Sequence, residues 1–227
     1  MNRAFDFYEY AGILVPGAVL IMGLLWLFPD GRALLSKEGV TLGELGLFVI
    51  VAYAAGQLVQ AVGNYIEWAW WKLWGGMPSV LVLGGKYVTA DQHRRILDAI
   101  RSGGMSADPN LEKLPRVQRL AIVREMYSVV AAAKGASRVD IFNGIYGLTR
   151  GLAAAMLILV GAAVGTSKGL FIIGALGIGV LLSLQRMHRF GKYYAIELFV
   201  QFLGATGKTG TGDQSPEVTG SLQPTAG

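Results

Sequence analysis

Four polar side chains recur along one apolar stretch of the sequence, and their spacing makes them the first candidates for chemistry. Gln57, Gln60, Asn64 and Glu67 are separated by three, four and three residues, which places them on one face of a helix. Amide and carboxylate groups inside a hydrocarbon layer need protein or water as partners, because lipid offers none. This face therefore predicts either hydrogen bonds between helices or the lining of a polar path.

Arg150 supplies a cation that could reach this face from another apolar stretch. At 1.5 Å per residue, Arg150 lies about 22 Å from the outer end of its stretch at Gly165, near the depth expected for Gln57 and Gln60. We expect Arg150 to pair with Glu67 or with the glutamines, and these five residues to form a polar intramembrane layer. A hydrogen-bond network that fixes helix packing is the favoured role, and a pore-lining layer in an oligomer is the alternative.

No motif for catalysis, a cofactor or a metal is recognisable. The sequence has no cysteine, and His93 and His188 do not belong to a metal-ligand spacing. The run 84–86 (Gly-Gly-Lys) lacks the upstream glycine and the hydroxyl residue of a P-loop. We therefore predict that the protein is not an enzyme and that it uses no cofactor and no metal. Nucleic acid is not an expected partner, because membrane orientation explains the net charge of +5 more simply.

Four apolar blocks must position the polar layer. Hydrophobic residues make up 53% of the chain and charged residues 15%, whereas a soluble domain carries about 25% charged residues. Since a helix needs roughly 20 residues to cross the hydrocarbon core, we predict an all-α integral membrane protein with four transmembrane helices. The third must begin early, and the fourth could continue as a helix beyond Gln185. The blocks are residues 11–28, 45–62, 141–165 and 169–184.

Charge and aromatic residues predict the orientation. Lysine and arginine concentrate between the second and third blocks and after the fourth, while the two other connections hold only Arg32, Lys37 and Lys168. The positive-inside rule then places the long connection and both termini in the cytoplasm, with the protein in a bacterial inner membrane. Four tryptophans follow the second block, and we predict them to be interfacial anchors, with a ligand-stacking cage as the alternative. They are Trp68, Trp70, Trp71 and Trp74.

The long connection is the only segment that resembles soluble protein. Thr89 and Gln92 fit a capping box that opens a helix to about Arg101, and a second helix is predicted from Pro115 to Lys134. Residues 80–83 fit either a short strand or a continuation of the interfacial segment. The predicted divisions are 1–67 for transmembrane helices one and two, 68–138 for the cytoplasmic helical insert with its tryptophan segment, 139–203 for transmembrane helices three and four with a cytoplasmic extension, and 204–227 for a disordered tail.

Small residues predict how the last two blocks pack. Ala175, Gly179 and Ser183 recur every four residues, and Gly161 and Gly165 show the same spacing on the preceding block. This spacing permits close approach of membrane helices. Because the connection between the two blocks is only three residues long, we expect a tight hairpin.

Three segments together resemble small multi-pass bacterial inner-membrane proteins: Phe7-Tyr8-Glu9-Tyr10 leading into Leu14-Val15-Pro16-Gly17, the run 52–64, and the helix 189–202. Such proteins are similar in plan to membrane components of prokaryotic phage-defence systems, in which a cytoplasmic part binds a partner or signal and the spans oligomerise.

We predict a non-enzymatic homo-oligomer of the inner membrane whose insert engages a cytoplasmic protein partner or a signal, because a bare four-helix anchor would not need the long connection 68–138. The alternative is a small oligomeric ion channel or transporter with the Gln57–Glu67 face lining the path. A membrane enzyme acting on lipid or cell-wall precursors is the least supported class, because no catalytic constellation is visible.

Overall fold

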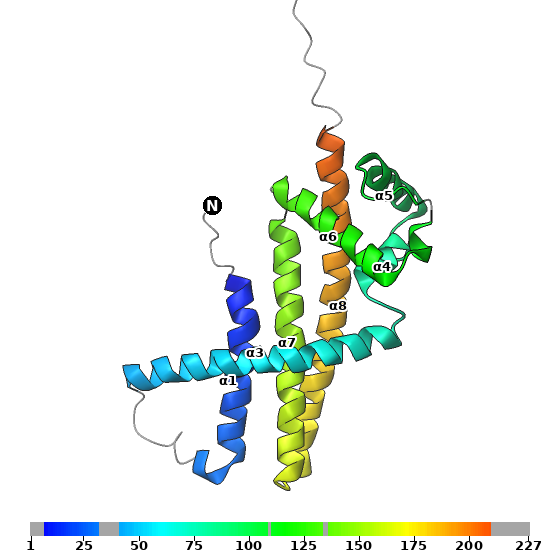
Figure 1. The fold of residues 1–227 in the computed structure, drawn as a ribbon. Helices are drawn as coiled ribbons and strands as arrows, with labels where there is room; N and C mark the ends of the chain where they lie inside the picture. The colour runs from blue at the N-terminus through cyan, green and yellow to red at the C-terminus, as the bar shows by residue number, and fades with distance from the viewer. Residues whose placement is uncertain (1–6, 32–40, 109, 134–135, 210–227) are drawn as a thin grey trace, which may run out of the picture.

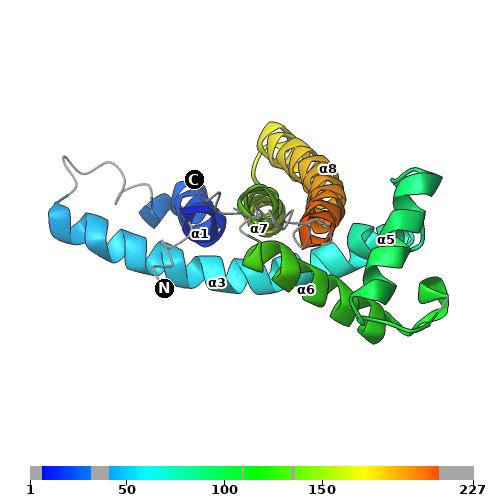
Figure 2. The same ribbon diagram turned by 90° about the horizontal axis from the view of Figure 1, so that it is seen from above.

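Three long helices stand side by side and a fourth lies across them. The computed structural model describes residues 7–31, 41–108, 110–133 and 136–209, and every regular element in these ranges is helical. α1 (Phe7–Leu27), α7 (Ser137–Gly165) and α8 (Leu170–Thr209) form a row, while α3 (Leu42–Leu73) runs crosswise over α1 and α7. Figure 1 shows α3 lying across the upright helices, and Figure 2 shows the uprights close to end-on with α3 along its length.

These four helices suggest a multi-pass membrane protein. Each contains a window long and apolar enough to cross a bilayer, within Tyr10–Leu27, Leu42–Leu83, Ser137–Gly165 and Leu170–Gly207. The predicted all-α class with four apolar helices agrees with this composition. The crosswise position of α3 was not predicted, because the depth of each residue was estimated from its position in the sequence as if all four helices were parallel.

Glycines at the crossing allow α1 and α3 to touch backbone to backbone. A Cβ atom on Gly17 would overlap the backbone of Ala52 and lie 2.6 Å from the amide nitrogen of Gly56. Gly56 in turn faces the backbone of Ile13, where a Cβ would also overlap. Helices that cross steeply meet over a short length, so a few residues decide how closely they approach. The absence of side chains at these two positions therefore permits the arrangement.

α7 and α8 form the expected hairpin, joined by the short connection 166–169. The small residues contribute unequally to it. A Cβ on Gly179 would lie 2.5 Å from the sulfur of Met156, and the Ser183 hydroxyl lies 4.0 Å from the same sulfur. By contrast, a Cβ on Gly161 or Gly165 would meet no atom within 4 Å. The predicted packing role is thus wrong for this second pair.

The insert, defined here as residues 78–132, consists of short helices. They are α4 (Pro78–Leu83), α5 (Ala90–Ser102), the 3-10 helix η1 (Leu111–Lys113) and α6 (Arg116–Ala132). The capping box is confirmed, since the Thr89 hydroxyl accepts from the Gln92 amide at 3.2 Å and the Gln92 side chain accepts from the Thr89 amide at 3.0 Å. Residues 80–83 are helical, so the strand alternative is wrong. Gly75 and Gly76, at φ of 84° and 129°, form the turn from α3 into α4.

The hydrophobic core of the insert includes residues of α8. Its helices pack around the C-terminal half of α8, as expected for a segment too small to be stable alone. Phe199 and Phe202 of α8 are almost completely buried in the middle of this core. The other buried members are Val82, Leu83, Ile96, Ile100, Leu111, Ile122, Val123, Met126, Val130, Val139, Ala195 and Leu198. α8 therefore joins the apolar hairpin to the insert as one continuous helix.

All three predicted boundaries fall inside helices, and the one at 138/139 falls in the first turn of α7. α3 continues past residue 67 through the tryptophan segment to Leu73, so residues 68–73 belong to the long helix rather than to the insert. α8 continues past Gly204 to Thr209. The remainder of the predicted tail, 210–227, lies outside the described residues.

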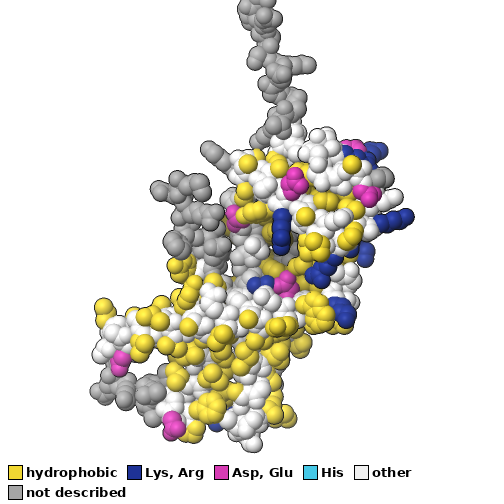
Figure 3. Space-filling model, in the orientation of Figure 1, with side chains coloured by type: hydrophobic (Ala, Val, Ile, Leu, Met, Phe, Trp, Pro, Cys, Tyr) yellow, Lys and Arg dark blue, Asp and Glu magenta, His cyan; other side chains and the backbone are white. Residues whose placement is uncertain are grey.

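Charge is segregated along the upright helices. In Figure 3, lysine and arginine side chains gather over the insert and the level where α3 crosses, while the face below is mostly hydrophobic. The described start of α1 and the end of α8 lie on the insert side in Figure 1. Lys168, in the hairpin connection, lies at the opposite end.

Candidate functional site, a polar cavity at the helix crossing

Gln60 compensates for a proline in the neighbouring helix. Pro16 lacks an N–H group, so the carbonyl of Gly12, four residues earlier, loses its partner within α1. The Gln60 side-chain nitrogen donates to that carbonyl oxygen at 2.6 Å and also to the Gly147 carbonyl of α7 at 3.2 Å. One amide of α3 thereby bonds to both helices that it crosses. In an apolar surrounding a freed backbone group needs such a partner from a neighbouring helix.

Arg150 completes the network. Its Nε and one terminal nitrogen donate to the Gln60 side-chain oxygen at 3.2 and 2.9 Å, and its other terminal nitrogen forms an ion pair with Glu67. The side chains of Arg150 and Glu67 are 21% and 14% exposed. A Cβ on Gly63 would lie 3.2 Å from Cγ of Arg150, so this glycine leaves room for the arginine stem. The structure thus brings together Gln60, Glu67 and Arg150, the pairing expected from the sequence.

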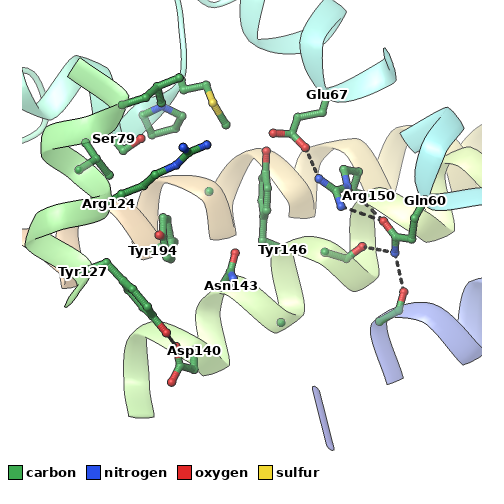
Figure 4. Close-up of a pocket in the computed structure, with 18 of the residues that line it drawn as sticks. Gln60, Glu67, Ser79, Arg124, Tyr127, Asp140, Asn143, Tyr146, Arg150 and Tyr194 are labelled. Carbon is green, nitrogen blue, oxygen red and sulfur yellow. Dashed lines mark hydrogen bonds and ion pairs between the residues drawn. The ribbon is translucent and has the colours of Figure 1, made fainter. Parts of the chain in front are cut away.

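This network forms one wall of a cavity of about 770 Å³ between α3, α6, α7 and α8. Figure 4 shows Arg124 of α6 on one side and the Arg150 network on the other, with Asn143 and Tyr146 of α7 between them. The Tyr127 hydroxyl donates to the Asp140 carboxylate at 2.7 Å. The lining polar residues are Gln57, Gln60, Glu67, Ser79, Arg124, Tyr127, Asp140, Asn143, Tyr146, Arg150 and Tyr194. The lining holds two cations, Arg124 and Arg150, and two carboxylates, Glu67 and Asp140, so the cavity suits a polar molecule without a marked preference for either charge.

The other members of the predicted polar layer lie at the edges of this arrangement. Gln57 is exposed and lines the same cavity. Asn64 is also exposed, and lines a second cavity on the other side of the ion pair. The helical face predicted from the three-four-three spacing therefore faces the cavities, but only two of its four side chains join the network around Arg150.

The tryptophans divide into two groups. Trp68 and Trp74 are 56% and 54% exposed, as an interfacial position allows. Trp71 is 2% exposed and its ring nitrogen donates to the Tyr146 hydroxyl at 2.7 Å, so it is a packing residue and the anchor prediction is wrong for it. Trp70 is partly buried and donates to Nδ1 of His188 at 3.3 Å. His188 also contacts the rings of Trp71 and Trp74, at centroid distances of 5.0 and 4.7 Å.

Apart from Arg150, the residues of α6 and α7 that line the cavity were not predicted from the sequence. A usable signal was present, because Asp140, Asn143, Gly147 and Arg150 repeat the three-four-three spacing of the α3 face. Arg124 has no comparable signal, since its helix position says nothing about which neighbour it meets. Within the described ranges no group of three or more His, Cys, Asp or Glu residues gathers closely enough to hold a metal ion.

The fold and the cavity define a helical protein with membrane-compatible helices and a small insert built onto the last of them. Comparison of the chain with protein-family models, with curated proteins and with solved structures finds no match.

Proposed function

We propose that this chain is a non-enzymatic, multi-pass protein of the bacterial inner membrane that couples a cytoplasmic partner or signal to its membrane helices. The observation that carries the proposal is the shared core of the insert and α8. Because Phe199 and Phe202 belong to that core, a partner that moves the insert also moves α8, and with it the hairpin. This movement would change the shape of the polar cavity, because its walls come from both the insert and the long helices.

The polar groups of the site support coupling rather than catalysis. Gln60, Glu67 and Arg150 satisfy one another and the backbones of α1 and α7. Groups held in this way fix the relative position of three helices. A change at Arg150 is therefore transmitted to α1 and α3 together.

Charge segregation supports the proposed orientation. Many basic residues lie on the insert side and Lys168 lies at the opposite end, so the positive-inside rule places the insert and both termini in the cytoplasm. In this orientation α1, α7 and α8 cross the bilayer, and α3 returns the chain from the outer end of α1 to the cytoplasmic insert. The plan is similar to that of membrane components of phage-defence systems, in which a membrane disturbance would be the output.

The exposed N-terminal half of α3 supports self-association. Its N-terminal half exposes large hydrophobic side chains that no described part of the chain covers: Leu42, Leu45, Leu47, Val49, Ile50 and Val51. A second copy of the chain would bury part of this surface against the same segment of its own α3. We therefore propose a homo-oligomer that forms through α3.

Photo-crosslinking in cells tests both parts of the proposal. A photoreactive residue is placed at Ile50 on α3, at Val117 on the insert, or at Leu170 in the hairpin, sites that are 68%, 78% and 83% exposed. We expect a dimer of the chain from Ile50, a larger hetero-adduct from Val117, and neither from the control at Leu170. Monomer alone from both Ile50 and Val117 would overturn the proposal.

A small oligomeric channel is the second candidate, and one observation favours it. The polar face of α3 lines two cavities that both include Glu67 and Arg150, so the ion pair separates two polar spaces. In a channel this pair would be the closed gate, and Glu67→Gln would raise ion flux through liposomes that contain the protein. If neither the native chain nor this variant conducts ions, the channel is ruled out and the coupling function remains.

A further inference from the structure

The second cavity is strongly cationic. It has a volume of about 670 Å³ and lies between the C-terminal end of α3, the start of α4 and the start of α6. Four cationic residues line it, Lys72, Arg116, Arg119 and Arg150, with Glu67 as the one carboxylate. Since Glu67 is already paired with Arg150, the remaining three positive charges face a space without a counter-charge from the described side chains.

One atom of Arg119, its Nε, is buried and meets no hydrogen-bond acceptor among the described residues, although the residue as a whole is only partly buried. A buried N–H of a charged group that is left unpaired costs free energy, so native structures rarely keep one without a ligand or water. The side chain lines the cavity, and an acceptor placed there would satisfy it.

The start of α6 adds to the positive potential. Arg116 is the first residue of this helix, its first turn contains no acidic residue, and Pro115 at the N-cap gives no side-chain cap. A cation at the positive end of a helix dipole is unfavourable by itself, but an anion bound beside it is stabilised by both. Arg116 and Arg119 are three residues apart and therefore lie on the same face of the helix.

We propose that this cavity binds a phosphate group through Lys72, Arg116 and Arg119. Guanidinium groups bind phosphate oxygens through paired N–H donors, and an ammonium adds a compact charge. The Lys72 nitrogen lies 5.1 Å from the centre of the exposed Trp68 ring, at the mouth of the site. The phosphate belongs either to the headgroup of an acidic phospholipid or to a free phosphate ion. Only the lipid source depends on the membrane location proposed above.

Native mass spectrometry and thermal stability together test the site. The full-length chain is released from mixed micelles that contain equal amounts of phosphatidylglycerol and phosphatidylcholine with the same acyl chains. We expect the chain to retain one phosphatidylglycerol, and Arg119→Gln to reduce that retention about tenfold, as loss of a charge-assisted hydrogen bond predicts. The control is Arg186→Gln, which removes an exposed cation that lines neither cavity.

Inorganic phosphate, added to the delipidated protein, distinguishes the two sources. We expect it to raise the melting temperature of the native chain and of Arg186→Gln, but not that of Arg119→Gln. Without phosphate, Arg119→Gln should melt no lower than the native chain, because it removes an unpaired buried donor. Stabilisation by phosphate without lipid retention identifies a free phosphate ion as the source. If Arg119→Gln changes neither the lipid retention nor the phosphate response, the proposal is wrong, whatever the result for membrane coupling.

Discussion

Replacing Gln60 by leucine should weaken the helix crossing, and the size of the effect should depend on Pro16. The substitution removes the donor to the Gly12 and Gly147 carbonyls and the acceptor for Arg150. A hydrogen bond contributes about 0.5–1.5 kcal/mol and one to a charged group about 1.5–3 kcal/mol. Bonds between membrane helices fall near the lower limit. We therefore expect Gln60→Leu to reduce the free energy of unfolding by about 2–4 kcal/mol.

Pro16→Ala should recover part of this loss. An alanine restores the backbone N–H, so the Gly12 carbonyl regains a partner within α1 and no longer needs the glutamine. In the Pro16→Ala background, Gln60→Leu should therefore cost about 1 kcal/mol less than in the native chain. The coupling between two residues 44 positions apart in the sequence is the signature of the proposed compensation.

Unfolding of the four proteins by sodium dodecyl sulfate in mixed micelles, followed by tryptophan fluorescence, measures the cycle. Gln57→Leu is the matched control, since Gln57 lies one turn earlier on the same face and is exposed. It should change the unfolding free energy by no more than about 0.5 kcal/mol. If the losses from Gln60→Leu and Pro16→Ala are additive, Gln60 does not serve the carbonyl that Pro16 leaves free, and the reasoning fails.

Two further pairs of substitutions test the helix crossing and the orientation of the chain. Gly17→Ala should destabilise the protein by more than about 2 kcal/mol because overpacking forces the backbones apart, whereas Gly161→Ala, in open space, should stabilise it by roughly 0.5–1 kcal/mol; equal melting temperatures would contradict the close approach. The chain has no cysteine, so Thr41→Cys and Ser167→Cys report the two connections that lie away from the insert in the proposed orientation. An impermeant maleimide added from outside should label both variants, and protection of either one would contradict that orientation.

The sequence predicted the local structure well because the signals were local. The Thr89–Gln92 capping box lies within four consecutive residues, and its helix begins as predicted. The same motif at Thr41 and Glu44 was overlooked, although it opens α3 in the structure. The apolar blocks were found because length and composition alone define them.

Prediction of the site was right about partners and wrong about geometry. Arg150 and Gln60 were predicted to lie at the same depth in parallel helices. In the structure the two residues meet because α3 crosses α7. The position of α3 depends on its close contact with α1 at Gly17 and Gly56, which are 39 positions apart and show no local sequence signal of their contact. Arg124 could not be assigned to the cavity for the same reason, since its place follows from the packing of the insert on α8.

The shared core of α8 and the insert has a consequence for the order of folding. The last helix of the insert ends at Ala132, but Phe202, which closes its core, is synthesised 70 residues later. At a translation rate of about 5–20 residues per second, the apolar faces of α5 and α6 are not covered by α8 for roughly 4–14 s. In the proposed orientation the insert is then an incomplete domain beside a membrane that is still receiving α7 and α8. Its apolar faces stay uncovered by α8 until the final helix is made.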